Sequence, residues 1–209
     1  MTVVLPKHKL VYIEAPRTAS RTTHRWLLDR YEGVELSSKR HLGALPARQL
    51  LAQDDSFGSV ADYRFFGFTR NPYSGMVSAW LQTKCQPNIA EEWRWLQELA
   101  QATPDFPAYL KAAHETAGDA WLGAAKWVYR LRTCHDVLRF EDGFPEVLIA
   151  YLRYQGLCLH SDDILAIPHV GKSNKNPDWR SYYNDEAREL VGRVFRRYLR
   201  KYDYAFALP

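Results

Sequence analysis

Two segments of this chain each run from an apolar strand pattern into a helix pattern through a loop rich in hydroxyl and guanidinium side chains. They span residues 11–23 and 65–78. A helix N-terminus presents unpaired backbone N–H groups and the positive end of the helix dipole, so a loop of this kind favours phosphate or sulfate. Two such loops in one small chain predict a site for a ligand that carries two separated anionic groups.

Strand and helix patterns alternate along most of the sequence. Strands are predicted at residues 10–15, 64–69 and 136–140, and helices at residues 22–31, from 72 onward, 90–102, 106–116, 119–131, 145–155 and 185–202. Asn71 and Pro72 suit the cap and the first turn of the helix after the second strand. The alternation predicts an α/β three-layer sandwich, in which helices flank a central parallel sheet. In such folds ligands bind at the carboxyl ends of the strands, which is where both loops fall.

The composition suits one domain that spans residues 1–209. The chain has 209 residues, of which 46% are hydrophobic, and no segment rich in Pro, Gly or Ser divides it. A chain of this length can bury a substantial single core. Its formal charge of +4 fits anionic ligands but is too small to indicate nucleic-acid binding by itself.

The three cysteines, Cys85, Cys134 and Cys158, are scattered and lack metal-ligand spacing. An odd, dispersed set of this kind is typical of a reduced compartment. The first residues lack a long apolar segment, and no run approaches the roughly 20 apolar residues that a membrane helix requires. We therefore expect a cytoplasmic protein with no membrane anchor, no metal site and no nucleic-acid partner.

The two loops resemble the cofactor-binding motifs of sulfotransferases that use 3′-phosphoadenosine 5′-phosphosulfate (PAPS), in particular the carbohydrate-type and bacterial members. Residues 16–23, PRTASRTT, are similar to the family loop that holds the 5′-phosphosulfate. Residues 70–80, RNPYSGMVSAW, are similar to the run that binds the 3′-phosphate. Similar segments at residues 41–44, 138–141 and 169–173 extend the resemblance over most of the chain. It implies a fold like that of the P-loop nucleotide-binding proteins.

The resemblance also implies a role for each residue of these motifs. The implied cofactor-binding residues are Arg17, Thr18, Ala19, Ser20, Arg21, Thr22, Thr23, Arg70, Ser78, Lys172 and Ser173. Arg17 would also be catalytic, because it would stabilise the charge that develops during transfer. Arg70 and Ser78 would hold the 3′-phosphate, which ATP lacks. Lys172 and Ser173 would lie in a segment that closes over the cofactor, and the scheme needs no metal.

Two positions depart from the family pattern. Arg17 occupies the position of a lysine that approaches the bridging oxygen of the phosphosulfate, and Gly75 that of an arginine. An arginine holds two oxygens at once and stays charged at any working pH, whereas a lysine can give up a proton. We therefore expect Arg17 to stabilise negative charge without donating a proton to the leaving group.

The general base has three candidates, His41, Glu14 and Glu141. A histidine titrates near neutrality, and the pKa of a carboxylate in a closed site can be raised towards it. His41 is preferred, because it follows the first predicted helix in a loop that could return to the site and because the family often has a histidine in a similar stretch. Glu141 is expected instead to orient Arg139 or a cofactor group.

The implied activity is transfer of a sulfuryl group from PAPS to an acceptor hydroxyl, with 3′-phosphoadenosine 5′-phosphate (PAP) as the product. A carbohydrate hydroxyl is the first expectation, and a small-metabolite hydroxyl is the alternative. Residues 84–132 are the natural place for acceptor selection. A non-catalytic module that binds nucleotides or polyanions through the same arginines remains a further alternative. A kinase is disfavoured, because the GKS run at residues 171–173 lacks the first glycine of a P-loop and lies between two prolines.

Overall fold

The computed structural model describes residues 2–38, 42–87, 89–123, 130–167 and 178–207. The contacts divide the chain into two compact units, residues 1–70 with 127–171 and residues 71–126 with 172–209. Both units are discontinuous in sequence. The prediction that the chain forms one domain therefore stays a prediction, and each unit is described by itself.

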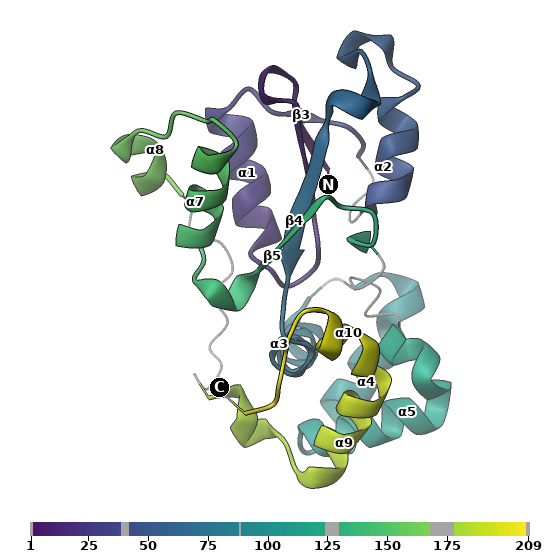
Figure 1. Ribbon diagram of the computed structural model, residues 1–209. Coiled ribbons are helices and arrows are strands. Elements are labelled where there is room, and N and C mark those ends of the chain that lie inside the picture. Colours follow the sequence, from purple (N-terminus) through teal and green to yellow (C-terminus); the bar gives the residue numbers. More distant parts are fainter. Residues whose placement is uncertain (1, 39–41, 88, 124–129, 168–177, 208–209) are drawn as a thin grey trace. The chain divides into compact units, whose positions relative to one another are not determined.

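The first unit is built around a mixed five-stranded sheet (Figure 1). Its strands are β1 (Val3–Leu5), β2 (Leu10–Ile13), β3 (Val34–Glu35), β4 (Arg64–Thr69) and β5 (Asp136–Arg139), in the spatial order β3-β1-β2-β4-β5. β2, β4 and β5 are parallel, whereas β1 pairs antiparallel with both β2 and β3. The predicted parallel sheet is therefore confirmed for three strands only. The turn of residues 6–9 between β1 and β2 is too short for the crossover that a parallel pair requires.

Helices flank this sheet, as the sequence predicts (Figure 1). They are α1 (Ser20–Arg30), α2 (Ala44–Leu51), α7 (Glu146–Tyr154) and α8 (Ser161–Leu165), with short 3-10 turns at Pro6–His8, Asp55–Phe57, Val60–Asp62 and Phe140–Asp142. On one face, Tyr12, Phe66 and Phe68 join residues of α1 and α7 in a buried core. On the other face, the Arg48 side chain of α2 lies over the ring of Phe65, with 4.0 Å between the guanidinium carbon and the ring centroid.

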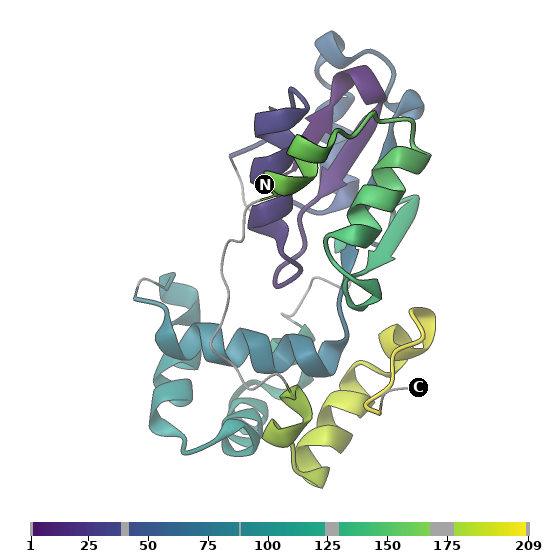
Figure 2. The same cartoon turned by 90° about the vertical axis from the view of Figure 1, so that its left-hand side faces the viewer.

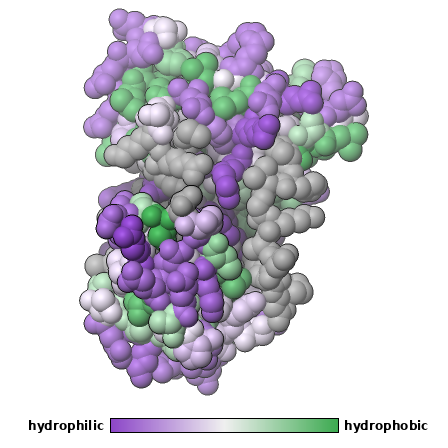
Figure 3. Space-filling view, turned by 180° about the vertical axis from the view of Figure 1, so that it is seen from behind, coloured by the Kyte–Doolittle hydropathy of each residue, from purple (hydrophilic) through white to green (hydrophobic). Residues whose placement is uncertain are grey.

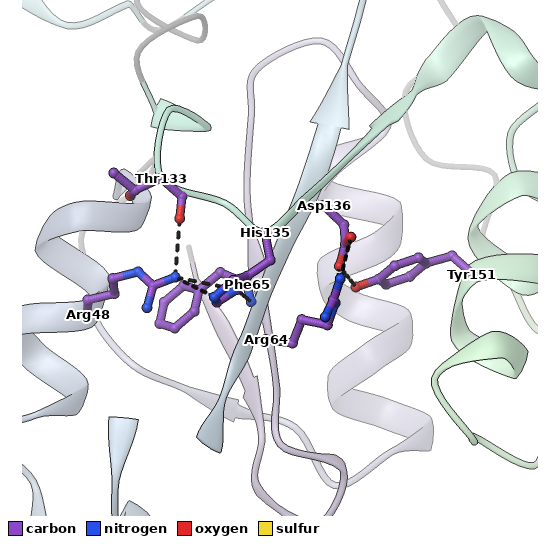
Figure 4. Close-up of polar contacts among 7 residues, drawn as sticks. All are labelled: Arg48, Arg64, Phe65, Thr133, His135, Asp136 and Tyr151. Atoms are coloured by element: carbon purple, nitrogen blue, oxygen red, sulfur yellow. Dashed lines mark hydrogen bonds and ion pairs between the residues drawn. The ribbon is translucent and has the colours of Figure 1, made fainter. Parts of the chain in front are cut away.

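A polar network joins the amino-terminal ends of β4 and β5 (Figure 4). Arg64 donates from Nε and Nη2 to the carboxylate of Asp136, and the Tyr151 hydroxyl donates to the same carboxylate at 2.9 Å. The backbone N–H of Phe65 donates to Nδ1 of His135 at 2.8 Å, and the backbone N–H of His135 donates to the Phe65 carbonyl at 2.8 Å. These bonds hold the parallel register of the two strands and thereby fix where their carboxyl ends lie.

The second unit is helical in the part of the chain that the structure describes (Figure 2). It contains α3 (Pro72–Cys85), α4 (Arg94–Ala102), α5 (Phe106–Gly123), α9 (Asp185–Val194) and α10 (Arg196–Lys201), with 3-10 turns at Glu91–Trp93 and Trp179–Tyr182. The predicted start of α3 is confirmed, since Pro72 lies in its first turn and the Asn71 side chain accepts from the Tyr73 N–H at 3.0 Å. Aromatic rings pack together in this unit: Tyr73, Trp80, Phe106, Trp179, Tyr183 and Phe206.

Two of the predicted helix boundaries in this unit have a visible physical cause. Gly118 leaves the helical conformation with a φ of 60°, which separates α5 into a part close to the predicted range of 106–116 and a part that ends at Gly123. Residues 124–129 of the helix predicted at 119–131 lie outside the described residues, and that helix stays a prediction. The helix predicted at 185–202 is interrupted at Phe195, which caps both α9 and α10. In the first unit, the helix predicted at 22–31 corresponds to α1, which begins earlier, at Ser20.

Candidate anion-binding site

Within the first unit, the two predicted loops begin at one edge of the sheet. β2 and β4 are parallel, and Ile13 at the end of β2 lies opposite Gly67 of β4. Residues 14–19 follow β2 and lead into α1, while Arg70 follows the last residue of β4. The carboxyl ends of neighbouring parallel strands are the usual place for ligands in α/β sheets. The prediction that both loops fall at these ends is confirmed.

The loop after β2 has an unusual backbone conformation. Arg17 and Ala19 both lie in the left-handed region, with φ of 65° and 53°. Non-glycine residues are uncommon there, because each costs roughly 1–2 kcal/mol. Left-handed residues in a tight loop turn backbone N–H groups towards a common point, a geometry that binds anions. The Thr18 hydroxyl supports this shape by donating to the Ala15 carbonyl at 2.8 Å.

The first turn of α1 presents its amino end to the same loop. Ala19 is the cap residue and supplies no side-chain hydrogen bond to the helix. The first helical bond runs from the Thr23 N–H to the Ala19 carbonyl at 3.0 Å. The N–H groups of Ser20 and Arg21 therefore precede the first helical bond and have no acceptor within the helix. Together with the helix dipole, they favour an anion at this end of α1.

The hydroxyls of the loop differ in their surroundings. Thr18 and Thr23 are fully buried and lie beside the hydroxyl of Tyr12, whose pKa is raised by burial and lowered in part by these two neighbours. Ser20 and Thr22 are buried to a similar degree, with exposed fractions of 7% and 3%. Thr18 and Thr23 therefore shape the loop from inside. Direct contact of their hydroxyls with a cofactor stays a prediction.

The guanidinium group of Arg17 lies within electrostatic reach of those of Arg70 and Arg21. The pKa of Arg17 is lowered to about 10 by burial, and further by the positive charges of Arg70 and Arg21. Arg70 is only 7% exposed, and its Nη1 donates to the Arg17 carbonyl at 2.7 Å. Arg17 keeps its charge at neutral pH, and the positive charges of Arg70 and Arg21 act on it unfavourably. An anion among these groups is attracted to all three of them, so the residues present fit a ligand with phosphate or sulfate groups.

The third parallel strand contributes to the same edge of the sheet. Arg139 ends β5 opposite Thr69 of β4, and its Nε lies 3.5 Å from a carboxylate oxygen of Asp142. The ring of Phe140 lies beneath the Arg70 guanidinium, 5.2 Å from the ring centroid to the guanidinium carbon. Phe140 is not among the residues that the sequence motifs predict for the site. An aromatic residue directly after the third predicted strand is the signal that could have identified it.

The three candidate bases differ in what the structure shows of them. Glu14 is 3% exposed and directly follows β2, whereas Glu141 is exposed in the turn after β5. Both carboxylates thus come from residues at the carboxyl edge of the sheet. His41 lies outside the described residues. Its selection as the base stays a prediction.

For the remaining predicted site residues, a place at this edge stays a prediction. Ser78 belongs to α3 in the second unit, where it is 1% exposed, and its pairing with Arg70 on one phosphate stays a prediction. Lys172 and Ser173 lie outside the described residues. In the second unit a cavity of about 400 Å³ lies beside α5 and α9. Its lining mixes both signs of charge: Lys111, His114, Glu115, Glu186, Glu189 and Arg193.

Across the described ranges, no three His, Cys, Asp or Glu side chains are grouped so that they could hold a metal ion. None of the helices within these ranges is both long and apolar enough to cross a membrane. Hydrophilic and hydrophobic side chains are interspersed on the face shown in Figure 3. The large apolar side chains that are exposed come from several separate elements: Val34, Leu45, Trp93, Tyr154 and Leu165.

Comparisons with known proteins identify no relative of this chain. No protein-family model matches the sequence. Searches of curated proteins and of solved structures likewise find no match.

Proposed function

We propose that this protein is a PAPS-dependent sulfotransferase that acts on an acceptor hydroxyl, first of all a carbohydrate hydroxyl. The observation that carries the proposal is the convergence of Arg17, Arg21 and Arg70 around a left-handed loop at the carboxyl edge of the sheet. Such a cluster of cations, in which Arg70 is buried and Arg17 is half-buried, favours a ligand with more than one anionic group. The motif resemblance supplies the identity of that ligand.

In this proposal the chain binds the donor from two sides. The N–H groups at the start of α1 and the Arg17 guanidinium hold the 5′-phosphosulfate, while Arg70 holds the 3′-phosphate. Arg17 keeps its charge at neutral pH, because a pKa of about 10 leaves it protonated. Its fork accommodates two oxygens of the group that gains negative charge.

The bound donor supplies an activated sulfuryl group. In the reaction the acceptor oxygen forms a new bond to sulfur, the bond between sulfur and the bridging phosphate oxygen breaks, and the hydroxyl proton passes to the base. His41 is proposed as that base, with Glu14 and Glu141 as the other candidates. The protein's contribution is then positioning and charge stabilisation, as in phosphoryl transfer.

Calorimetric titration with PAP, AMP and ATP tests the proposal directly. We expect micromolar binding of PAP and much weaker binding of AMP, because only PAP carries the 3′-phosphate. Arg70→Ala should weaken PAP binding strongly and AMP binding to a lesser degree, because only PAP loses a direct contact to the 3′-phosphate. Arg94→Ala is the matched control, since it removes the same charge from an exposed position on α4.

Equal affinity for PAP and AMP would remove the 3′-phosphate assignment and with it the sulfotransferase proposal. Unchanged PAP affinity in Arg70→Ala would refute the role of that residue alone. Binding of DNA or RNA whose log affinity falls by several units per log unit of salt would favour the polyanion-binding alternative.

A further inference from the structure

Arg70 connects all three parallel strands at the edge that carries the candidate site. It directly follows β4, its Nη1 donates to the Arg17 carbonyl beyond β2, and its guanidinium lies over the Phe140 ring beyond β5. At 7% exposure the side chain is largely withdrawn from solvent. Its orientation is therefore set by the protein before any ligand is bound.

The loop that Arg70 reaches is one whose conformation needs support. Arg17 and Ala19 are both left-handed without being glycine. Residues in such sparsely populated conformations persist only where the surroundings hold them, at a cost of about 1–3 kcal/mol each. The Thr18 hydroxyl bond to the Ala15 carbonyl is local to the loop. The bond from Arg70 to the Arg17 carbonyl comes from a different strand and fixes one of the two left-handed residues itself.

Repulsion between guanidinium groups opposes this tether. The positive charges of Arg70 and Arg21 both lower the pKa of Arg17, so each of them acts unfavourably on Arg17. An anion that neutralises Arg70 removes one of these repulsions while the hydrogen bond to the Arg17 carbonyl remains. The loop conformation is then more favourable than in the ligand-free protein.

We infer that Arg70 is a positioning residue that couples the two anionic subsites, because an anion on its guanidinium stabilises the loop that holds the second anion. The inference rests on the proposed function only in taking both anions as parts of one donor. A donor that lacks the 3′-phosphate would then bind to a less ordered loop, and would lose turnover as well as affinity.

Hydrogen–deuterium exchange on the ligand-free protein tests the tether without any cofactor. Arg70→Ala should accelerate exchange of the amides in residues 17–20. Arg21→Ala is the matched control, because it also removes one positive charge close to Arg17 but does not supply the bond to the Arg17 carbonyl. It should leave exchange in the loop unchanged or slower. Equal exchange in the wild type and Arg70→Ala would overturn the inference.

Arg70→Lys provides a second test in case Arg70→Ala does not fold. Lysine keeps the charge and a donor on a side chain one bond shorter, so loop exchange should lie between those of the wild type and Arg70→Ala. Thermal unfolding confirms that each variant is folded. Exchange as fast as in a folded Arg70→Ala would contradict a specific fit of the guanidinium to the Arg17 carbonyl.

The coupling itself is measured with two separate probes, adenosine 3′-monophosphate and inorganic sulfate. Saturating adenosine 3′-monophosphate should raise the affinity for sulfate by about fivefold or more, the lower end of typical coupling between sites. Simple repulsion between the two anions predicts the opposite sign, so unchanged or weaker sulfate binding would overturn the coupling. Faster loop exchange in Arg70→Ala, with no binding of adenosine 3′-monophosphate by the wild type, would keep the tether and count against the proposed function.

Discussion

The conformation and surroundings of Arg17 are less favourable than those of a surface arginine. Its backbone is left-handed, and its guanidinium is partly desolvated beside two other cations. Under the proposed function it stabilises the charge that develops on the transferring group. Arg17→Ala should therefore lower turnover by about 100- to 1,000-fold, the effect typical of removing one preorganised charge donor. Arg17→Lys should lose less turnover, since lysine keeps the charge but cannot make a bidentate contact with two oxygens. Steady-state kinetics with PAPS measure both variants, and full activity of Arg17→Ala would refute the role.

The choice of base gives a separate prediction. His41→Ala should lower turnover and leave PAP affinity unchanged, because a base contacts the acceptor hydroxyl and not the nucleotide. Glu14→Gln and Glu141→Gln, tested beside it, identify the base by the same pair of measurements. Weaker PAP binding in His41→Ala would instead make this residue a ligand contact.

At the scale of residues, the sequence identifies the types of group at the site but not the contacts between them. Arg17 and Arg70 are both predicted from loop motifs, and the structure brings them together. The hydrogen bond from Arg70 to the Arg17 carbonyl could not be predicted, because it depends on the φ of 65° at Arg17 and on the pairing of β4 with β2. Neither property follows from residue types in a single sequence.

At the scale of elements, length decided what could be predicted. β4 and the long helices carry enough residues for a periodic pattern, and they are found close to their predicted bounds. β1 has three residues and β3 has two, which is too few for periodicity to show. α2 and α8 were missed as well, and their eight and five residues give at most about two turns each. The mixed character of the sheet went undetected because β1 was among the missed strands.

The contact between α2 and the amino ends of β4 and β5 predicts a pH dependence of stability. The pKa of His135 is lowered by partial burial, by Arg48 and by Arg64. Nδ1 also accepts from the Phe65 N–H, which only the unprotonated nitrogen can do. The unfolded chain binds a proton at His135 more readily than the folded protein does. The stability that neutral His135 contributes is therefore present above the ordinary histidine pKa of about 6.5 and is lost as pH falls below it.

His135→Asn tests this contribution, because the asparagine oxygen can still accept from the Phe65 N–H but does not titrate. Denaturant unfolding at pH 7.5 and at pH 5.5 should show a smaller loss of stability in the variant than in the wild type. Asp136 provides no competing titration in this window, since its pKa is lowered by Arg64 and it stays ionised. An identical pH dependence in both proteins would show that His135 does not contribute.

At the scale of the whole molecule, the course of the chain bears on how it unfolds. The chain passes between the two compact units after residues 70, 126 and 171, so neither unit is one continuous segment. A unit assembled from two distant segments must close a long loop to form alone, which costs entropy. We therefore expect one cooperative transition, in agreement with the prediction of a single domain over residues 1–209. Calorimetry decides this, because a two-state transition requires equal calorimetric and van't Hoff enthalpies.

The same experiment with PAP connects the site to the stability of the whole chain. A ligand at 100 times its dissociation constant stabilises the folded state by about 2.7 kcal/mol. For a chain of this size that corresponds to a rise in Tm of about 5–10 °C. Arg70→Ala should show almost no rise at the same PAP concentration, whereas Arg94→Ala should behave as the wild type. If PAP raises only one of two separate transitions, the single-domain prediction fails while ligand binding stands. If PAP leaves the transition in place, the proposed donor site is wrong.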